Sequence, residues 1–536
     1  MSSAPTKHYL EVPPKQTLVL LTTRLWPGVR PPSYAQSMTA TADLLDRSES
    51  VRVRTLAQLE PSSQSKLGQF FTNSRTASLL TSMPRLPREG SVRLLDPGAG
   101  SGALSAALIA RLLAEAPGVS IDLTAVELDP SVVPALRETL TACAATAESL
   151  GASLTFEVVQ GSYVDVAETL GSDFDIVVMN PPYAKLAAGD PDRRKVAVAL
   201  VDPANIYAAF IALGISNLKT AGQLVAITPR SFTNGLYFEP FRRWLLAEAS
   251  FDRIHIYGSR SSVFADTGVL QENIIWSVTR GGSRGTVSLT ASTDHHEIGT
   301  ARTVRYDEIV HPDDAHQYIR IPAATSDTEI VGLMAQLPSR LADLGVQAST
   351  GRVVDFRSRD QLVEPALAEH YPMVYPSNIS GGAVTHPRTA GKPQWYSITE
   401  ADDRKWLVPS GIYVLIKRFS AKEERRRIVA GVWDDALQRA TPVAFDNKLN
   451  YIHAAGQGLD RELAFGLALW LNSTVVDDYF RTFSGHTQVN ATDLRGMRFP
   501  AVEVLRELGE GRSEMPDQTV IDELVQTVLS TLEAAA

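Results

Sequence analysis

The stretch Phe174-Asp-Ile-Val-Val-Met-Asn-Pro-Pro-Tyr183 decides the fold of this chain. Its first six residues are mostly apolar and β-branched, which predicts a strand from Phe174 to Met179 that is buried on both faces of a sheet. The two prolines that follow have no N–H to donate, so the chain leaves the sheet as a stiff loop. This loop carries an amide, a free carbonyl and an aromatic ring at the carboxyl end of a strand, where open α/β sheets bind ligands.

The strand lies within a chain of 536 residues, which is long enough for two large domains. With 44% hydrophobic and 21% charged residues, the composition is that of a globular protein with an ample core. We see no signal peptide and no apolar run long enough to span a bilayer, so we expect a cytoplasmic protein. The one cysteine, Cys143, excludes an internal disulfide framework and a cysteine-built metal site. The net charge of −9 argues against a wholly electrostatic nucleic-acid binder, although it allows a local basic cleft.

Upstream, Val92-Arg-Leu-Leu-Asp-Pro-Gly-Ala-Gly-Ser-Gly102 predicts a strand, a glycine-rich turn and then a helix from Ala103 to about Glu115. Asp96 stands at the end of the strand. The turn has three glycines that let the backbone approach a ligand closely at a helix N-terminus: Gly98, Gly100 and Gly102. A lone G-x-G-x-G motif is weak evidence, but its position between a strand and a helix strengthens it.

The next predicted strand, Asp122 to Val126, ends in Glu127, which is placed to hold both ribose hydroxyls of a nucleoside. A third strand, Leu154 to Val159, leads to Ser162 and Tyr163, a candidate wall for the base of that nucleoside. These features predict a nucleotide-type pocket.

The rest of this region continues the alternation of helices and strands. We predict helices at about Ala204–Leu218 and Phe238–Ala249, and strands at Gln223–Thr228, Arg253–Tyr257 and Asn273–Val278. The pattern indicates an α/β fold with a doubly wound, seven-stranded Rossmann-like sheet.

Ahead of the glycine-rich turn, Gly68-Gln-Phe-Phe-Thr72 precedes a predicted helix from Ser74 to Met83. Such a turn can offer N–H groups and a hydroxyl to a carboxylate, because helix starts favour anions. Taken alone, the segment is better explained as an ordinary capped helix start.

Four motifs follow one another along the chain: Gly68-Gln-Phe-Phe-Thr72, Asp96-Pro-Gly-Ala-Gly-Ser-Gly102, Val126-Glu-Leu-Asp129 and Asn180-Pro-Pro-Tyr183. Together they resemble the S-adenosylmethionine-dependent DNA adenine-N6 methyltransferases of the gamma arrangement, found in type II restriction–modification systems. The chain departs from that pattern at Asn73, where proline is usual, and at Ser162, where aspartate is common.

The resemblance covers roughly residues 50–285 and implies roles for particular residues. It assigns catalysis to Asn180, Pro181, Pro182 and Tyr183, and stacking on the target base to Tyr183 and Phe238. It assigns S-adenosylmethionine binding to Thr72, Asp96, Gly98, Gly100, Gly102, Glu127, Ser162, Tyr163 and Asn180, and it implies no metal.

We divide the chain into an N-terminal extension (1–50), a methyltransferase domain (51–285), a linker with irregular strands (286–330) and a mixed α/β domain (331–536). The last of these resembles a TaqI-like target-recognition domain, chiefly through its closing segment, Phe483 to Pro500. Within that segment, Asn490 to Asp493 predict a helix-capping turn.

Candidate DNA contacts lie in two segments of this last domain. Lys417 to Arg427 holds six basic and two acidic residues in eleven, which fits a phosphate-binding edge and equally a charge-paired turn. The candidates are Lys417, Arg418, Arg425, Arg426, Arg427, His486 and Gln488, of which the last two are more readily explained as structural.

The proposed chemistry needs positioning rather than a covalent intermediate. Asn180 Oδ1 and the Pro181 carbonyl can accept the two hydrogens of an adenine amino group, while Tyr183 and Phe238 enclose a base that has left the duplex.

Cys143 and the motifs also bear on alternatives to adenine methylation. C5-cytosine methylation requires a cysteine nucleophile, and Cys143 lies in an alanine-rich helical stretch typical of packing. Cytosine-N4 methylation stays open, as does methylation of RNA or a protein amide; a non-catalytic DNA-specificity subunit fits the motifs less well. No nuclease motif accompanies the others, so we expect a cognate restriction endonuclease as a separate chain.

Overall fold

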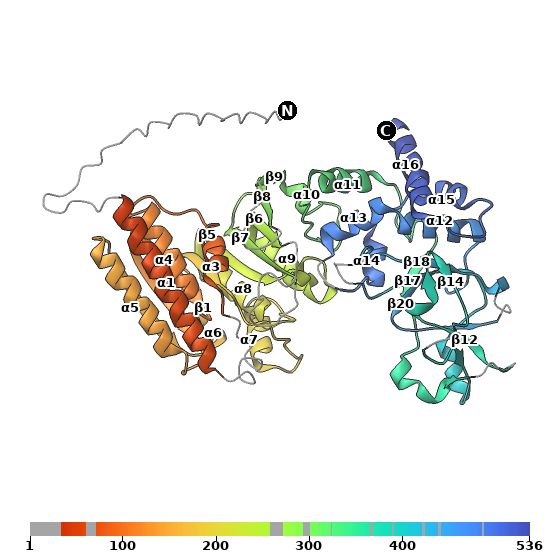
Figure 1. Ribbon diagram of the computed structural model, residues 1–536, viewed down its shortest axis with the longest axis horizontal. Coiled ribbons are helices and arrows are strands. Elements are labelled where there is room, and N and C mark those ends of the chain that lie inside the picture. The colour runs from red at the N-terminus through yellow and green to blue at the C-terminus, as the bar shows by residue number, and fades with distance from the viewer. Residues whose placement is uncertain are drawn as a thin grey trace, which may run out of the picture.

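The computed structural model describes residues 34–59, 71–257, 272–292, 301–322, 324–364, 367, 369–388, 391–420, 424–437, 441–484 and 487–535. Figure 1 shows two parts side by side along the longest axis of the molecule, one formed by the N-terminal half and the other by the C-terminal half. A large sheet lies at the centre of the first part, and two smaller sheets form the second.

The large sheet confirms the predicted Rossmann-like core, although in the described residues it has nine strands instead of the predicted seven. Its strands are β1 (Ser91–Pro97), β2 (Ser120–Glu127), β3 (Leu154–Gln160), β4 (Phe174–Met179), β5 (Leu218–Pro229), β6 (Ala249–Tyr257), β7 (Asn273–Arg280), β8 (Thr286–Ser292) and β9 (Arg302–Arg305). Their order is β3-β2-β1-β4-β5-β7-β6-β8-β9. The first five are parallel, and β7 runs antiparallel between β5 and β6.

The segment predicted as a linker instead extends this sheet. β8 pairs with β6 in parallel and β9 pairs with β8 antiparallel, so residues of the 286–330 segment belong to the sheet. Val287, Leu289 and Val304 are buried in the same core as the central strands. Two helices follow, α10 (Tyr306–Ile309) and α11 (Thr325–Gln336).

Helices cover both faces of the large sheet. One face packs against α1 (Tyr34–Gln58), α3 (Ser74–Thr81), α4 (Ala103–Glu115) and α5 (Val133–Ser149). The other face packs against α6 (Tyr163–Val166), α8 (Ile206–Asn217) and α9 (Glu239–Glu248), with α7 (Pro191–Ala199) alongside. The buried residues of α8 lie on all its sides, which is why its sequence is apolar almost throughout.

Helix α1 crosses the boundary that we predicted at residue 50. It packs along α4 and α5, and Leu44 and Val51 are buried there. Glu49 Oε2 accepts a hydrogen bond from the Ser74 N–H at 3.1 Å, at the N-terminus of α3. The part of the predicted extension that the structure describes is therefore a supporting helix of the first part.

The C-terminal part is mixed α/β, as predicted. One sheet has the order β10-β20-β17-β18-β14-β13 and the other β11-β15-β12-β19-β16. The strands are β10 (Gln347–Thr350), β11 (Leu362–Val363), β12 (Tyr371–Val374), β13 (Ile379–Ser380), β14 (Ala383–Val384), β15 (Trp395–Tyr396), β16 (Leu407–Val408), β17 (Tyr413–Lys417), β18 (Ala430–Trp433), β19 (Val443–Phe445) and β20 (Leu449–His453). The helices are α12 (Arg461–Asn472), α13 (Thr474–Phe483), α14 (Ala491–Gly496), α15 (Val502–Gly509) and α16 (Gln518–Ala535).

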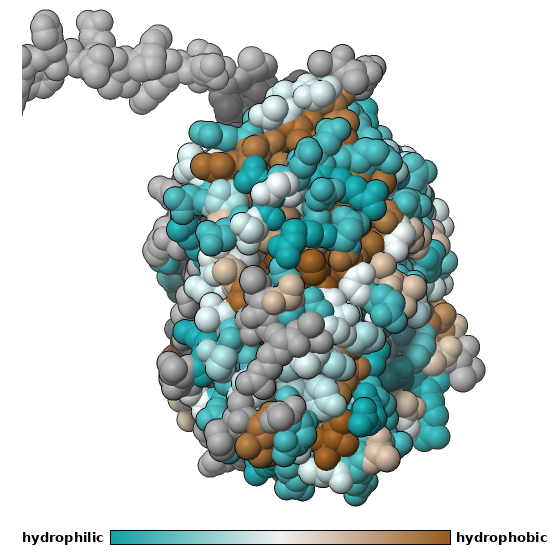
Figure 2. All heavy atoms as spheres, turned by 90° about the vertical axis from the view of Figure 1, so that its right-hand side faces the viewer, coloured by the Kyte–Doolittle hydropathy of each residue, from teal (hydrophilic) through white to brown (hydrophobic). Residues whose placement is uncertain are grey.

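The end of the molecule formed by this part has a mainly hydrophilic surface with smaller hydrophobic groups between (Figure 2). The capping turn predicted at Asn490 is confirmed. Asp493 Oδ2 accepts from the Asn490 N–H at 2.9 Å, at the start of α14.

The two parts meet where the loop after β5 touches the end of α13. Arg230 Nη2 donates to the carbonyls of Arg481 and Thr482 at 3.1 and 2.6 Å, and Thr233 Oγ1 donates to the Phe483 carbonyl at 3.3 Å. Arg230 is itself buried and paired with Glu272 at 2.9 Å. The loop after β5 is therefore fixed to the C-terminal part.

Candidate active site

A cavity of about 730 Å³, counted to its open mouth, lies at the carboxyl ends of β1, β2 and β4. Strand order reverses between β1 and β4, so this is the switch point at which doubly wound sheets bind ligands. The cavity is lined by Phe71, Thr72, Gly98, Ala99, Gly100, Ser101, Ala103, Leu104, Glu127, Leu128, Asn180, Pro182 and Phe210.

The glycine-rich turn forms the floor of the cavity. Gly98 and Gly100 have φ values of 74° and 56°, in the region that favours glycine. A Cβ on Gly100 would lie 3.0 Å from the Phe71 ring, so the turn also leaves no space for a side chain there. The Gly98 and Ala99 N–H groups both donate to the Val126 carbonyl at 2.9 Å, which ties the turn to the end of β2.

Glu127 closes one wall of the cavity. Its Oε2 accepts from the Gly100 N–H and its Oε1 from the Asp129 N–H, both at 2.8 Å. Burial raises the pKa of this carboxyl. Each carboxylate oxygen has more than one lone pair, so Glu127 can accept further hydrogen bonds from hydroxyls in the cavity.

Asp96 and Gly102 support the turn from behind instead of lining the cavity. Asp96 is 1% exposed and its Oδ2 accepts from Ser105 Oγ at 2.6 Å. Its Oδ1 has no hydrogen-bond partner among the described residues, and burial raises the pKa of Asp96 to about 7. Gly102 has a φ of 85° at the start of α4, with Leu136 and Thr139 close by.

Asn180 lies on the opposite wall, with its amide held at both ends. Nδ2 donates to Thr72 Oγ1 at 2.9 Å, and Oδ1 accepts from the Tyr183 hydroxyl at 2.9 Å. The Tyr183 hydroxyl also lies 3.1 Å from the Ile227 carbonyl at the end of β5. These contacts set the orientation of the Asn180 amide toward the cavity.

A row of aromatic rings leads away from Asn180. The edge of the Tyr207 ring meets Tyr183, with centroids 6.3 Å apart, and Phe238 stacks on Tyr207 at 5.4 Å with a 23° tilt. Tyr207 is buried and its hydroxyl contacts Ser231 Oγ at 3.1 Å. The two predicted base-stacking residues thus lie on either side of Tyr207, which the sequence analysis did not single out.

Comparison with known proteins agrees with this geometry. The family model described as Eco57I restriction-modification methylase matches residues 151–264, which include Asn180 to Tyr183. The type II methyltransferase M.PstI of Providencia stuartii is 37% identical over 497 residues, covering 90% of this chain and 97% of that relative. M.BsuBI of Bacillus subtilis is 37% identical over 455 residues, covering 83% and 90%. The chain belongs to the type II methyltransferases of restriction–modification systems.

A solved structure shows the same fold over most of this type II methyltransferase. It is the type IIL restriction-modification enzyme MmeI in complex with DNA, with a TM-score of 0.50 and 13% identity, covering 94% of this chain and 74% of that one.

Besides Asp96 and Gly102, two more predicted cofactor contacts of this methyltransferase lie outside the cavity lining. The Tyr163 ring is buried beside Phe210, and its hydroxyl donates to Asn217 Oδ1 at 2.7 Å, so its contacts are those of a core residue. Ser162 stands at the start of α6. Phe210, from α8, lines the cavity instead, and its place in an apolar helix gave no signal in the sequence.

The predicted DNA contacts divide into two groups. Arg427 is buried, and its guanidinium donates to Ser420 Oγ at 3.2 Å and Ser484 Oγ at 3.0 Å. Arg426 donates to the Ser473 carbonyl and Thr474 Oγ1 at 3.1 and 2.9 Å, at the start of α13. Both of these side chains are therefore held by the fold.

The remaining candidates lie nearer the surface. Lys417 and Arg418 are half-buried, and Arg425 is exposed. Arg418 Nη2 donates to Gln488 Oε1 at 3.3 Å and lies beside the exposed Phe419 ring. His486 lies outside the described residues.

Cys143 is buried in α5, and burial raises the pKa of its thiol to about 12, so it packs and does not reach the cavity. Among the described residues, no group of three or more His, Cys, Asp and Glu is arranged to hold a metal ion. None of the helices formed by the described residues is long and apolar enough to cross a bilayer.

Proposed function

We propose that this methyltransferase transfers a methyl group from S-adenosylmethionine to the N6 amino group of adenine within a specific double-stranded DNA sequence. The observation that carries the proposal is the Asn180 amide, which is held by Thr72 and Tyr183 at the wall of the cavity at the carboxyl ends of β1, β2 and β4. In this proposal the chain has the gamma arrangement, and its C-terminal part is a TaqI-like target-recognition domain.

The cavity fits S-adenosylmethionine on several counts. Glu127 offers carboxylate lone pairs to a ribose diol, and Phe71, Leu128 and Phe210 offer apolar walls to a planar base. The positive-φ glycines clear the floor of side chains. Behind them, Asp96 Oδ1, which has no hydrogen-bond partner among the described residues, would place a negative charge near a cationic ligand once it is ionised. When bound, S-adenosylmethionine supplies a methyl group that its sulfonium already activates.

The protein then has to position and polarise the target amine. A carbonyl oxygen accepts two hydrogen bonds, so Asn180 Oδ1 can take one amine hydrogen beside the Tyr183 hydroxyl. In this proposal the Pro181 carbonyl accepts the other. Two such acceptors draw the nitrogen lone pair out of conjugation and toward the methyl group. Tyr183 and Phe238 enclose the base after it leaves the duplex.

The candidate DNA contacts divide into two groups with different proposed roles. We propose that Lys417, Arg418, Arg425 and Gln488 contact DNA, while Arg426 and Arg427 hold the domain together. The biological role is protection of host DNA from a cognate restriction endonuclease on a separate chain.

The test is to express the wild type and Asn180→Ala in a host without adenine methylation, and to sequence its DNA by a method that detects N6-methyladenine. We expect methylated adenine in one fixed sequence context, absent with the variant. A mark on cytosine N4 in a fixed context would overturn the adenine assignment. No mark from a folded wild-type protein that binds S-adenosylmethionine would overturn DNA as the substrate.

A further inference from the structure

The loop between β5 and α9 holds two neighbouring aromatic residues in opposite environments. Phe238 stacks on the buried Tyr207, whereas the next residue back, Tyr237, is 85% exposed. No other large hydrophobic side chain among the described residues reaches that exposure; Phe356 follows at 61%. Leu236, before Tyr237, is also exposed, at 43%.

Single exposed aromatic residues are common on protein surfaces, so exposure alone carries no function. This one is held in place by a compact loop. The Gly235 N–H donates to the Ser231 carbonyl and the Phe238 N–H to the Gly235 carbonyl, at 3.0 and 3.1 Å. A Cβ on Gly235 would lie 2.7 Å from the Ser231 carbonyl, so the turn depends on glycine.

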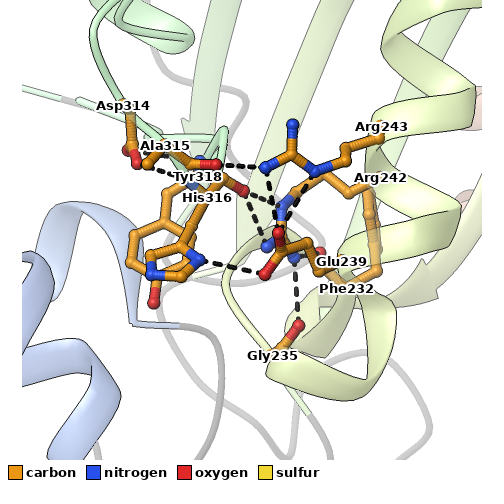
Figure 3. A network of polar contacts seen from close by, with 9 residues as sticks. All are labelled: Phe232, Gly235, Glu239, Arg242, Arg243, Asp314, Ala315, His316 and Tyr318. Carbon is orange, nitrogen blue, oxygen red and sulfur yellow. Dashed lines mark hydrogen bonds and ion pairs between the residues drawn. The ribbon is translucent and has the colours of Figure 1, made fainter.

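A buried arginine fixes the same loop to the rest of the protein (Figure 3). Arg242 Nη1 donates to the carbonyls of Phe232 and Gly235 at 2.9 and 3.1 Å. Its Nε and Nη2 donate to the His316 carbonyl at 3.0 and 2.9 Å. Glu239, at the start of α9, pairs with His316 Nδ1 at 2.9 Å. The exposure of Tyr237 is thus imposed by a loop with fixed ends.

The position of Tyr237 connects it to the chemistry. Phe238, Tyr207 and Tyr183 lead by ring contacts to Asn180, so Tyr237 projects next to the aromatic wall of the proposed base pocket. The same loop is fixed to the C-terminal part through Arg230 and Thr233. The exposed Tyr237 ring therefore belongs to a loop that joins the aromatic row beside Asn180 to the C-terminal part.

We propose that Tyr237 occupies the gap that the flipped adenine leaves in the DNA base stack. The inference rests on the proposed function and adds to it a residue that acts on the DNA instead of on the reacting atoms. A flipped base leaves two base pairs with exposed π faces, and a flat aromatic ring covers them better than water does. Because the loop is already ordered, placing the ring there costs little conformational entropy.

The test uses a DNA duplex that contains the recognition sequence, with the fluorescent adenine analogue 2-aminopurine in place of the target adenine. The fluorescence of the 2-aminopurine is measured at saturating protein. The wild type should raise the fluorescence strongly, because the base leaves the neighbouring bases that quench it in the duplex. Tyr237→Ala should lower this saturated signal and slow single-turnover methylation of the adenine duplex by about 5- to 150-fold, the range expected for losing one base–aromatic stack. Tyr237→Phe keeps the ring and should match the wild type.

Two controls separate this role from others. The unfolding midpoint and S-adenosylmethionine affinity of Tyr237→Ala should equal those of the wild type, since the side chain is exposed. Phe356→Ala removes another exposed aromatic ring and should leave the saturated fluorescence unchanged. If Tyr237→Ala weakens DNA binding but keeps both the saturated signal and the rate, the ring contacts the outside of the duplex and the inference is wrong. A wild type that neither methylates adenine nor raises the fluorescence overturns the proposed function itself.

Discussion

Replacing Thr72 by valine tests whether the orientation of the Asn180 amide sets the rate of methyl transfer. Thr72 is buried, and valine has nearly the same shape, so the substitution removes little more than the hydroxyl that accepts from Asn180 Nδ2 at 2.9 Å. Without that acceptor the amide can turn over and present its NH₂ group, which cannot accept a hydrogen bond, to the target amine. One neutral hydrogen bond contributes about 0.5–1.5 kcal/mol, so we expect the rate to fall about 2- to 12-fold.

The assay is single-turnover methylation of a duplex containing the recognition sequence, with enzyme and cofactor in excess. Thr72→Ser keeps a hydroxyl and should retain most of the rate, while Kd for DNA should be the same in all three proteins. Thr72 also lines the cavity, so cofactor affinity has to be measured in parallel. An unchanged rate for Thr72→Val at saturating cofactor, or a loss that saturating cofactor fully restores, would refute the reasoning.

Three further predictions concern side chains that the structure places away from the reacting atoms. Arg427→Ala should lower the free energy of unfolding by about 2–4 kcal/mol, because it removes buried charge-assisted hydrogen bonds, whereas the exposed Arg425→Ala should leave it unchanged in a denaturant titration; equal stability of the two variants would contradict the structural role. Burial raises the pKa of Asp96 to about 7, so its stabilising contribution is present at low pH and is lost as the pH rises through 7. Asp96→Asn stays neutral, and its unfolding midpoint should therefore fall less than that of the wild type between about pH 4 and 7, the window between the ordinary and the raised pKa; parallel curves would count against this. Cys143→Ala should keep the wild-type rate of methyl transfer, and a hundredfold loss would return the thiol to the chemistry.

The catalytic half of the fold was predictable because local sequence determines it. A buried strand, a proline-rich loop and a glycine-rich turn each leave a distinct pattern, and the structure places β4 at Phe174–Met179 and α4 at Ala103–Glu115, as expected. Parallel strands then bring their carboxyl ends together without further information. Thr72, Gly98, Gly100, Glu127 and Asn180 consequently line one cavity.

Helix α1 was missed because its buried face is not apolar. Apart from Arg52, its buried positions repeat at alternating spacings of four and three, which is a helical period, but most of them carry hydroxyls: Ser37, Thr41, Leu44, Ser48, Val51 and Thr55. Thr41 and Thr55 satisfy their hydroxyls on the carbonyls of Ser37 and Val51 within the helix, so they can be buried at little cost. A hydrophobic pattern cannot reveal such a face.

Tyr163 and Arg427 show a second limit, which is that sequence does not give the direction of a side chain. A tyrosine just after a strand can face a ligand or the core. Tyr163 faces the core, where its hydroxyl donates a hydrogen bond to Asn217 Oδ1. An arginine in a basic run can face solvent or fill the interior. Only the packing of distant segments decides between them.

The contacts between the two parts of the molecule have a consequence for how freely the C-terminal part can change in evolution. Arg230 and Thr233 reach the C-terminal part through the main-chain oxygens of residues 481–483, and Arg242 reaches the intervening segment through that of His316. Every amino acid carries a main-chain oxygen, so these contacts do not specify which side chains stand at the accepting positions. The C-terminal part can therefore diverge, or be exchanged for a relative's, while its attachment to the loop after β5 is preserved.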